Sequence, residues 1–157
     1  MSRFGECWDM DEEDERNSRL WWANAERALK GKRGRKVLVE LEAALLALPR
    51  PRLMEGRLSE AEGEYCALGA LAHARGVADE RMQQLDSLVD FDGGPTIEPT
   101  LQLGRELGIC GPLAAKIASV NDKEITYVGG AGFVPETPEQ RFSRVLAWVR
   151  DELRGHA

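Results

Sequence analysis

A mainly helical fold is first indicated by residues 35–51, RKVLVELEAALLALPRP. Apolar residues recur in this segment every three or four positions, which is the spacing of one face of an α-helix. They are Val37, Leu38, Leu41, Leu45 and Leu48. Proline lacks the amide hydrogen and clashes with the preceding helical turn, so Pro49 and Pro51 end the pattern. The sequence therefore predicts a helix over residues 35–48.

A second helix is predicted immediately before this one. Its apolar positions, also at helical spacing, are Leu20, Trp21, Ala25, Ala28 and Leu29. Gly31 is typical of a helix end, because glycine tolerates the left-handed backbone found there. The GKRG segment at 31–34 is then a short, positively charged linker between two helices.

After the prolines, weak alternation predicts a small β-hairpin with strands at 52–58 and 64–66. A helix over 66–75 follows, with Gly76 as its stop. Glycine inside a helix costs up to about 1 kcal/mol relative to alanine. Gly69 therefore indicates that another segment of backbone approaches this helix closely.

The next segments alternate between turn formers and short helical patterns. Residues 77–99 are polar and turn-rich, which predicts a long surface loop with a short helix near 80–88. In residues 100–120, Thr100 is a candidate N-cap, Gly108 a turn, and Pro112 the start of the next helix. The spacing of small and apolar residues here resembles a helix-turn-helix unit.

The end of the chain contains the clearest helix signal. Thr137, Pro138 and Gln140 occupy the N-cap, first and third positions of a capping box. The apolar face that follows comprises Phe142, Val145, Leu146, Val149 and Leu153, and residues 125–128 predict a short strand before it. The predicted fold class is mainly α (α+β), a compact helical domain with a small β-hairpin. It occupies residues 15–157, after an acidic N-terminal arm at 1–14.

Charge is distributed unevenly along the 157 residues, whose net charge is −6. Residues 1–15 carry seven acidic residues and one basic residue, whereas residues 16–36 carry eight basic residues and one acidic residue. No apolar run is long enough to span a bilayer, and the acidic start is unlike a secretory signal. Three scattered cysteines fit a reducing compartment. We therefore expect a cytoplasmic protein without membrane contact.

Residues suited to catalysis do not form a recognisable set in the sequence. Cys66 begins a predicted helix, but His73 lies seven residues later, about 10 Å along the axis. The histidines and cysteines lack zinc-site spacing, and the GKRG segment lacks the order of a phosphate-binding loop. Asn121 and Asp122 are explained by a turn that closes the preceding helix. We expect no enzyme activity, cofactor or metal.

Several motifs in order carry a family resemblance. They are GKRG at 31–34, CALGAL at 66–71, ARG at 74–76, ND at 121–122, ETPEQRF at 136–142 and AWV at 147–149. In this order they resemble a family of small uncharacterised proteins of bacteriophages and prophages. The resemblance implies a phage or prophage origin, and hence an infected or lysogenic bacterial cell as the location. It implies no established activity.

The leading functional hypothesis is a non-catalytic phage accessory protein that binds a host or defence protein, as an anti-CRISPR or another host-takeover factor would. Acidic proteins can present carboxylates to the Arg and Lys groups of a nucleic-acid-binding surface. The candidate partner-binding residues are Asp9, Asp11, Glu12, Glu13, Asp14, Glu15 and Trp22. Trp22 is included because it follows Trp21 on a helix, so the two rings point about 100° apart and one is left partly exposed. The alternative interpretation of the acidic run is a solvated tail without a binding role.

A second hypothesis is nucleic-acid binding through the helix-turn-helix-like segment 100–120 and a basic patch at 30–36. Its candidate residues are Lys30, Lys32, Arg33, Arg35, Lys36 and Lys116. The net negative charge and the single basic residue of the second helix argue against it. A third hypothesis is a thiol enzyme, which would require a reactive Cys66. A separate prediction concerns the two charged segments: residues 9–15 either contact a basic partner or fold back transiently over residues 30–36 and mask them until a partner competes.

Overall fold

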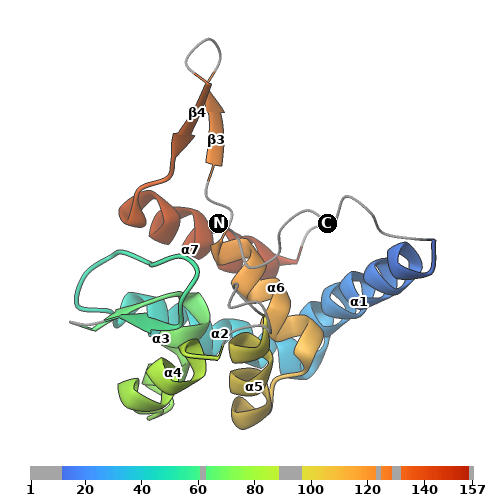
Figure 1. Ribbon diagram of the computed structural model, residues 1–157, viewed down its shortest axis with the longest axis horizontal. Helices are drawn as coiled ribbons and strands as arrows, with labels where there is room; N and C mark the ends of the chain where they lie inside the picture. Colours follow the sequence, from blue (N-terminus) through green and yellow to red (C-terminus); the bar gives the residue numbers. More distant parts are fainter. Residues whose placement is uncertain (1–11, 61–62, 89–96, 123–124, 129–131, 156–157) are drawn as a thin grey trace.

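Seven helices and two two-stranded antiparallel sheets make up the residues that the computed structural model describes, which are 12–60, 63–88, 97–122, 125–128 and 132–155 (Figure 1). The helices are α1 (Glu12–Lys30), α2 (Lys32–Leu46), α3 (Ala67–Ala74), α4 (Asp79–Asp86), α5 (Glu98–Leu107), α6 (Gly111–Asn121) and α7 (Pro138–Arg154). The strands are β1 (Ser59–Glu60), β2 (Glu64–Tyr65), β3 (Ile125–Val128) and β4 (Gly132–Pro135). The predicted mainly α fold with a small β-hairpin is confirmed.

The core forms where the apolar faces of the helices meet around α6 and α2. Helix α6 packs against α1, α3, α5 and α7, while α2 packs against α3 and α7. The apolar face predicted for α2 is buried, with Leu38, Leu41 and Leu45 almost inaccessible to solvent. No helix in the described ranges is long and apolar enough to cross a membrane.

Two parts of the chain extend from this core. The first half of α1 carries no buried residue before Ala25 among its described side chains. The β3–β4 hairpin pairs mainly with itself and stands away from the helices in Figure 1. The strand predicted at 125–128 is thus confirmed as half of a projecting hairpin.

Two glycines allow backbones to approach closely. A Cβ atom added at Gly34 of α2 would lie 1.7 Å from the carbonyl oxygen of Ala28 in α1. One added at Gly69 of α3 would lie 1.9 Å from the carbonyl oxygen of Leu58. Both distances are far shorter than a van der Waals contact, so only glycine fits. The close approach predicted from Gly69 is confirmed.

Helix boundaries differ from the predictions at three points. Helix α2 begins at Lys32 rather than residue 35. Helix α1 ends at Lys30, directly before Gly31 as predicted, but Gly31 has φ −78° and is the N-cap of α2 rather than a left-handed residue. Helix α5 begins at Glu98, so Thr100 is a buried residue inside the helix rather than its cap. Gly108 does end α5 in the left-handed conformation, with φ 71°.

The first hairpin is shorter than predicted. Only Ser59–Glu60 pairs with Glu64–Tyr65, so the strand predicted at 52–58 does not form. The amide of Leu53 instead donates to the carbonyl of Pro138 at 3.1 Å, and the amide of Met54 donates to Tyr65 at 2.9 Å. These hydrogen bonds to distant residues hold residues 52–58 in an irregular conformation between α2 and β1.

The starts of α7 and α1 can both be compared with the predicted helix boundaries. The capping box of α7 is present, since Thr137 accepts from the amide of Gln140 and the Gln140 side chain accepts from the amide of Thr137. At the other end, α1 begins at Glu12. Residues 12–14, which were predicted as part of the acidic arm, therefore belong to the first turn of α1.

Replacing Gly69 by alanine is expected to lower the free energy of unfolding by about 1–3 kcal/mol, because overpacked interiors carry a cost of that size. The added methyl group would overlap the Leu58 carbonyl. Urea denaturation measures the change. Gly31→Ala is the matched control, since its Cβ would lie 3.6 Å from the nearest atom, an ordinary contact. A Gly69→Ala variant as stable as the parent protein would contradict the close approach.

Candidate functional site

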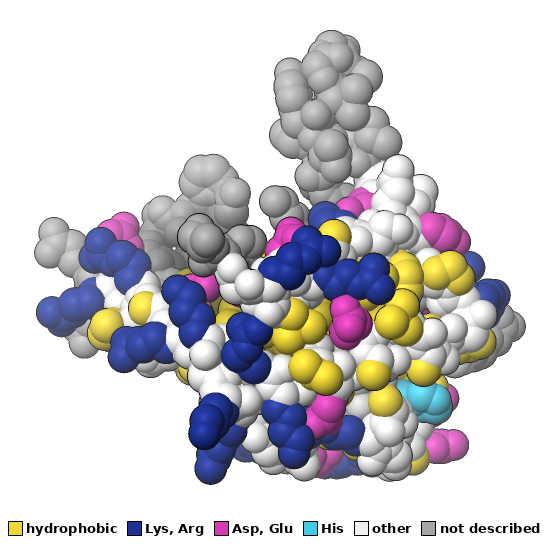
Figure 2. Space-filling view, turned by 180° about the vertical axis from the view of Figure 1, so that it is seen from behind, with side chains coloured by type: hydrophobic (Ala, Val, Ile, Leu, Met, Phe, Trp, Pro, Cys, Tyr) yellow, Lys and Arg dark blue, Asp and Glu magenta, His cyan; other side chains and the backbone are white. Residues whose placement is uncertain are grey.

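The most prominent surface feature is a row of exposed basic residues over α1 and the start of α2, which we call the basic face. It comprises Arg16, Arg19, Arg27, Lys30, Lys32, Arg33 and Lys36. In Figure 2, Lys and Arg side chains gather on the side of the molecule formed by α1 and its junction with α2. Within the described part of the chain, none of the seven forms an ion pair.

Helical spacing explains why these residues share a surface. On α1, positions 16, 19, 27 and 30 recur at intervals that keep them on the side opposite the buried Ala25 and Leu29. A single residue, Gly31, separates the two helices, and the close crossing at Gly34 brings their charged ends together. The result is a continuous basic surface across a helix junction.

The start of α2 is an unfavourable place for positive charge. The N-terminus of a helix carries a partial positive charge, which favours acidic residues in the first turn. The first turn of α2 contains no acidic residue but holds Lys32 and Arg33, and its N-cap makes no side-chain hydrogen bond. Lys32 and Arg33 therefore do not stabilise the helix, and they form no ion pair among the described residues. Residues that oppose local stability in this way favour a role in binding.

Apolar residues continue the same exposed side of α2 beyond the basic face. Val39, Ala43 and Leu46 follow Lys36 at intervals of three or four residues, and we call them the apolar stripe. Val39 and Leu46 are both 56% exposed. The acidic residues beside the stripe are neutralised internally, since Glu40 pairs with Arg75 at 2.7 Å and Glu42 with Arg150 at 3.1 Å.

A cavity of about 580 Å³ lies on the inner side of the helix junction, between α2 and the loop that joins α5 to α6. Val37, Ile109 and Leu113 form apolar parts of its wall. Lys32 and Arg33 line it as well, together with the exposed Cys110. The cavity therefore combines an apolar interior with two positive charges.

Two of the basic residues predicted to bind nucleic acid form contacts with other residues of this protein. Arg35 donates to the carbonyl oxygens of Glu152, at 3.4 Å, and Leu153, so it caps the end of α7. Lys116 forms an ion pair with Glu26 at 3.1 Å. The remaining predicted residues, Lys30, Lys32, Arg33 and Lys36, belong to the basic face.

The helix-turn-helix interpretation of residues 100–120 needs correction. Helices α5 and α6 do pack together around the Gly108 turn. A recognition helix must present one face to a groove of DNA. Helix α6 is instead the central helix of the core, and its buried residues are Leu113, Ala114, Ala115, Ile117, Ala118 and Asn121. Its packing against four other helices leaves no face for a groove.

The acidic residues predicted to contact a partner fall into two groups. Asp9 and Asp11 lie outside the described residues. Glu12, Glu13, Asp14 and Glu15 form the first turn of α1. Fifteen residues of helix rise about 22 Å, so this turn lies far from Lys30. Residues 12–15 therefore cannot fold back over the basic patch, and that hypothesis is wrong for them.

Trp21 and Trp22 are both half-buried. Trp21 packs against the start of α6, where a Cβ atom added at Gly111 would lie 3.0 Å from the indole ring. Trp22, the predicted anchor, retains partial exposure on α1. Its partial exposure keeps it a candidate contact residue, although it lies on the same side of α1 as Leu29 and not on the basic face.

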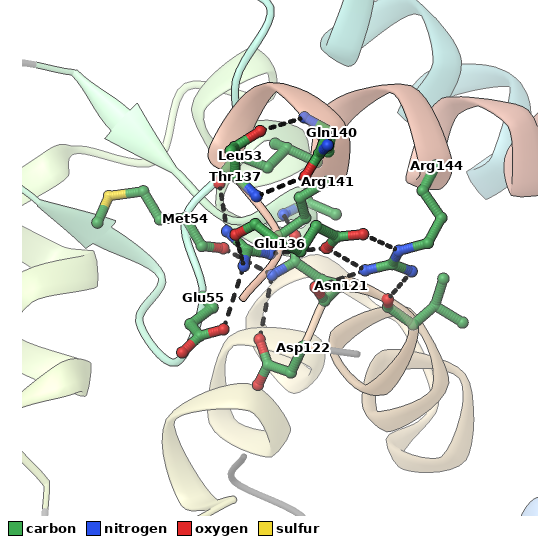
Figure 3. Close-up of polar contacts among 12 residues, drawn as sticks. Leu53, Met54, Glu55, Asn121, Asp122, Glu136, Thr137, Gln140, Arg141 and Arg144 are labelled. Carbon is green, nitrogen blue, oxygen red and sulfur yellow. Dashed lines mark hydrogen bonds and ion pairs between the residues drawn. The ribbon is translucent and has the colours of Figure 1, made fainter. Parts of the chain in front are cut away.

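A buried polar cluster, which was not predicted, joins α6, α7 and the segment at 53–56 (Figure 3). Arg141 donates to the Leu53 carbonyl at 2.9 Å and contacts the carboxylates of Glu55 at 3.1 Å and Glu136 at 3.4 Å. Arg144 binds the same Glu136 carboxylate at 2.7 Å and donates to the carbonyl of Val120 at 2.5 Å. One signal was present in the sequence, because Arg141 lies four residues before Val145 on the buried face of the helix.

Asn121 and Asp122 belong to this cluster as well as to the end of α6. The Asn121 side chain accepts from the amide of Ala67 at 2.9 Å and donates to the carbonyl of Met54 at 2.7 Å. Asp122 accepts from the amide of Gly56 at 3.1 Å. The pair closes the helix, as predicted, and also ties three segments together. Its polar atoms are committed to structural hydrogen bonds, so it is not an acid–base site.

Cys66 and His73, the residues considered as a catalytic pair, make separate contacts in the structure. Cys66 is fully buried and is the N-cap of α3, where its sulfur accepts from the amide of Gly69 at 3.4 Å. The His73 ring stacks on Tyr65, with its Nδ1 atom 3.0 Å from the Tyr65 hydroxyl. That hydroxyl donates to Asp79 at 2.7 Å. Among the described residues, no group of His, Cys, Asp and Glu is placed to hold a metal.

Comparisons of this chain with protein family models, curated proteins and solved structures found no match. The resemblance to phage proteins therefore stays a sequence-based hypothesis.

Replacing Arg141 by methionine is expected to lower the free energy of unfolding by about 1.5–3 kcal/mol, because it removes the charged donor to the buried Leu53 carbonyl and one of the two arginine partners of Glu136. Chemical denaturation checks this. The control is Arg150→Met on the same helix, because that exposed arginine pairs only at the surface, where ion pairs contribute about 0–1 kcal/mol. Equal stability of the two variants would contradict a structural role for the cluster.

Burial of Tyr65 and its hydrogen bond to Asp79 raise the pKa of its phenol from the usual 10.0 to about 12. The folded protein therefore holds the phenol proton more tightly than the unfolded chain does. Its contribution to stability is complete below pH 10.0 and is lost as the pH rises towards 12. Absorbance at the phenolate wavelength should show Tyr65 titrating near pH 12, and Tyr65→Phe should remove that step while the other tyrosine still titrates. An unchanged titration curve would contradict the assignment.

Proposed function

We propose that this chain is a non-catalytic binding protein that recognises an acidic surface of another protein through the basic face and the apolar stripe. The observation that carries the proposal is the outer side of α2. Lys32, Arg33 and Lys36, which have no ion pair within the described part of the chain, are followed there by exposed Val39 and Leu46. Protein interfaces combine apolar contacts with arginine and with complementary charge in this way.

The phage resemblance makes a host or defence protein of the infected bacterial cell the expected partner, as for an anti-CRISPR or a host-takeover factor. Such a partner would present carboxylates to the basic face and apolar side chains to the stripe. The buried cluster and the Tyr65 contacts are used to hold the fold, which supports a role in binding rather than catalysis.

Nucleic acid is the second candidate partner, because unpaired lysine and arginine also bind phosphates. The basic face extends along α1 and suits a polyanion in that respect. The apolar stripe favours protein, because phosphate groups gain nothing from exposed valine and leucine. Burial of α6 also removes the helix that would have read the bases.

Two double variants distinguish these partners. Lys30→Glu/Lys36→Glu reverses charge on the basic face, and Val39→Ser/Leu46→Ser makes the apolar stripe polar. A protein partner, recovered from bacterial lysate with the immobilised chain and then titrated in purified form, should lose roughly tenfold or more in affinity with each variant. Arg57→Glu/Arg105→Glu is the control, because it reverses two exposed charges elsewhere on the surface.

The same variants are titrated against DNA and RNA fragments in a salt series. Nucleic-acid binding that falls steeply with salt, is lost in the charge variant and persists in the apolar variant would favour the second candidate. Full binding of the protein partner by both variants would contradict the proposal. Melting temperatures confirm that each variant is folded.

A further inference from the structure

We propose that the cavity on the inner side of the α1–α2 junction binds a small amphipathic anion, with its charged head at Lys32 and Arg33 and its apolar body against Val37, Ile109 and Leu113. This site shares Lys32 and Arg33 with the basic face but lies on the other side of the helix junction from the apolar stripe. The two surfaces share the first turn of α2 but differ in every apolar residue.

The size and walls of the cavity suit a small molecule. Its volume of about 580 Å³ is within the range of about 300–1,000 Å³ usual for small-molecule sites. Val37, Ile109 and Leu113 are buried members of the core, so their positions are set by packing and the site is preformed. Ala28 and the glycines at 31, 34 and 108 also line the wall, and at Gly108 no atom lies within 4 Å of the place that a Cβ would take.

The charges around the cavity are all positive. Lys32 and Arg33 line it and have no acidic partner among the described residues. No acidic residue is among the described residues that form the wall. The first turns of α2 and α6 both contribute to the lining, and neither helix has an N-cap side chain that bonds its free amides. Their partial positive charges add to those of the two side chains.

Charge and apolar surface together define the ligand class. A purely polar anion would gain nothing from the apolar wall, and a neutral apolar molecule would gain nothing from the two exposed cations. A single anionic head on an apolar chain matches both parts of the site. A carboxylate and a phosphate monoester share this chemistry, so both head groups are tested.

The experiment is isothermal titration of the full chain with decanoate, decyl phosphate, decanol and decyltrimethylammonium, all below their micellar concentrations. Binding of at least one of the two anions is expected, with decanol at least roughly tenfold weaker and the cation without measurable binding. Lys32→Gln/Arg33→Gln should weaken anion binding by roughly tenfold or more and bring it close to that of decanol.

Cys110 allows a steric test that leaves the charges in place. Its side chain is exposed at the cavity wall, so Cys110→Phe is expected to fill the site and abolish anion binding while the protein stays folded. Cys110→Ser is the matched control and should bind as the parent protein does. Melting temperatures of both variants verify the fold.

Three results would overturn the inference: no heat of binding for either anion, equal binding of the anions and the cation, or full anion binding by a folded Cys110→Phe variant. The Cys110 variants leave the basic face and the apolar stripe unchanged, and Val39→Ser/Leu46→Ser leaves the cavity unchanged. Failure of this inference is therefore distinguishable from failure of the proposed function.

Discussion

Arg141 and Arg144 of α7 share the carboxylate of Glu136 in the interior, and their other donors reach carbonyl oxygens at Leu53, Val120 and Asn121. Charges withdrawn from water are costly unless geometry and hydrogen bonds compensate them. Each arginine can be satisfied only if α6, α7 and the segment after α2 take these relative positions. Since α7 packs on α2 and α6 packs on α1, the cluster connects the two pairs of larger helices.

Much of the fold was predictable because it depends on local chemistry. The periodicity of residues 35–48, the capping box at Thr137 and the stop at Gly108 all act within a few residues of chain, and each is present. The segment at 52–58 was wrongly predicted as a strand, because its conformation is set by amide bonds to Tyr65 and Pro138. Periodicity cannot show such contacts between distant parts of the sequence.

The sequence predicted that the candidate site is basic, but it did not show which of the basic residues are available to a partner. The sequence identified a basic segment, yet only the structure distinguishes Arg35 and Lys116, which have internal partners, from Lys32 and Lys36, which have none. A helix-turn-helix pattern also cannot reveal that its second helix is buried, because small apolar residues suit both a tight pair and a crowded core. The cavity was not foreseen, since its walls come from segments about 75 residues apart.

The contact between Arg35 and the last turn of α7 places the C-terminal end of that helix against the start of α2. An affinity tag, fluorescent protein or surface linker attached at the last turn of α7 would therefore lie close to the start of α2 and its basic residues. Such a fusion would crowd the surface by which the protein is proposed to work. Immobilisation through a site near Arg57 or Arg105, on other parts of the surface, keeps that face accessible.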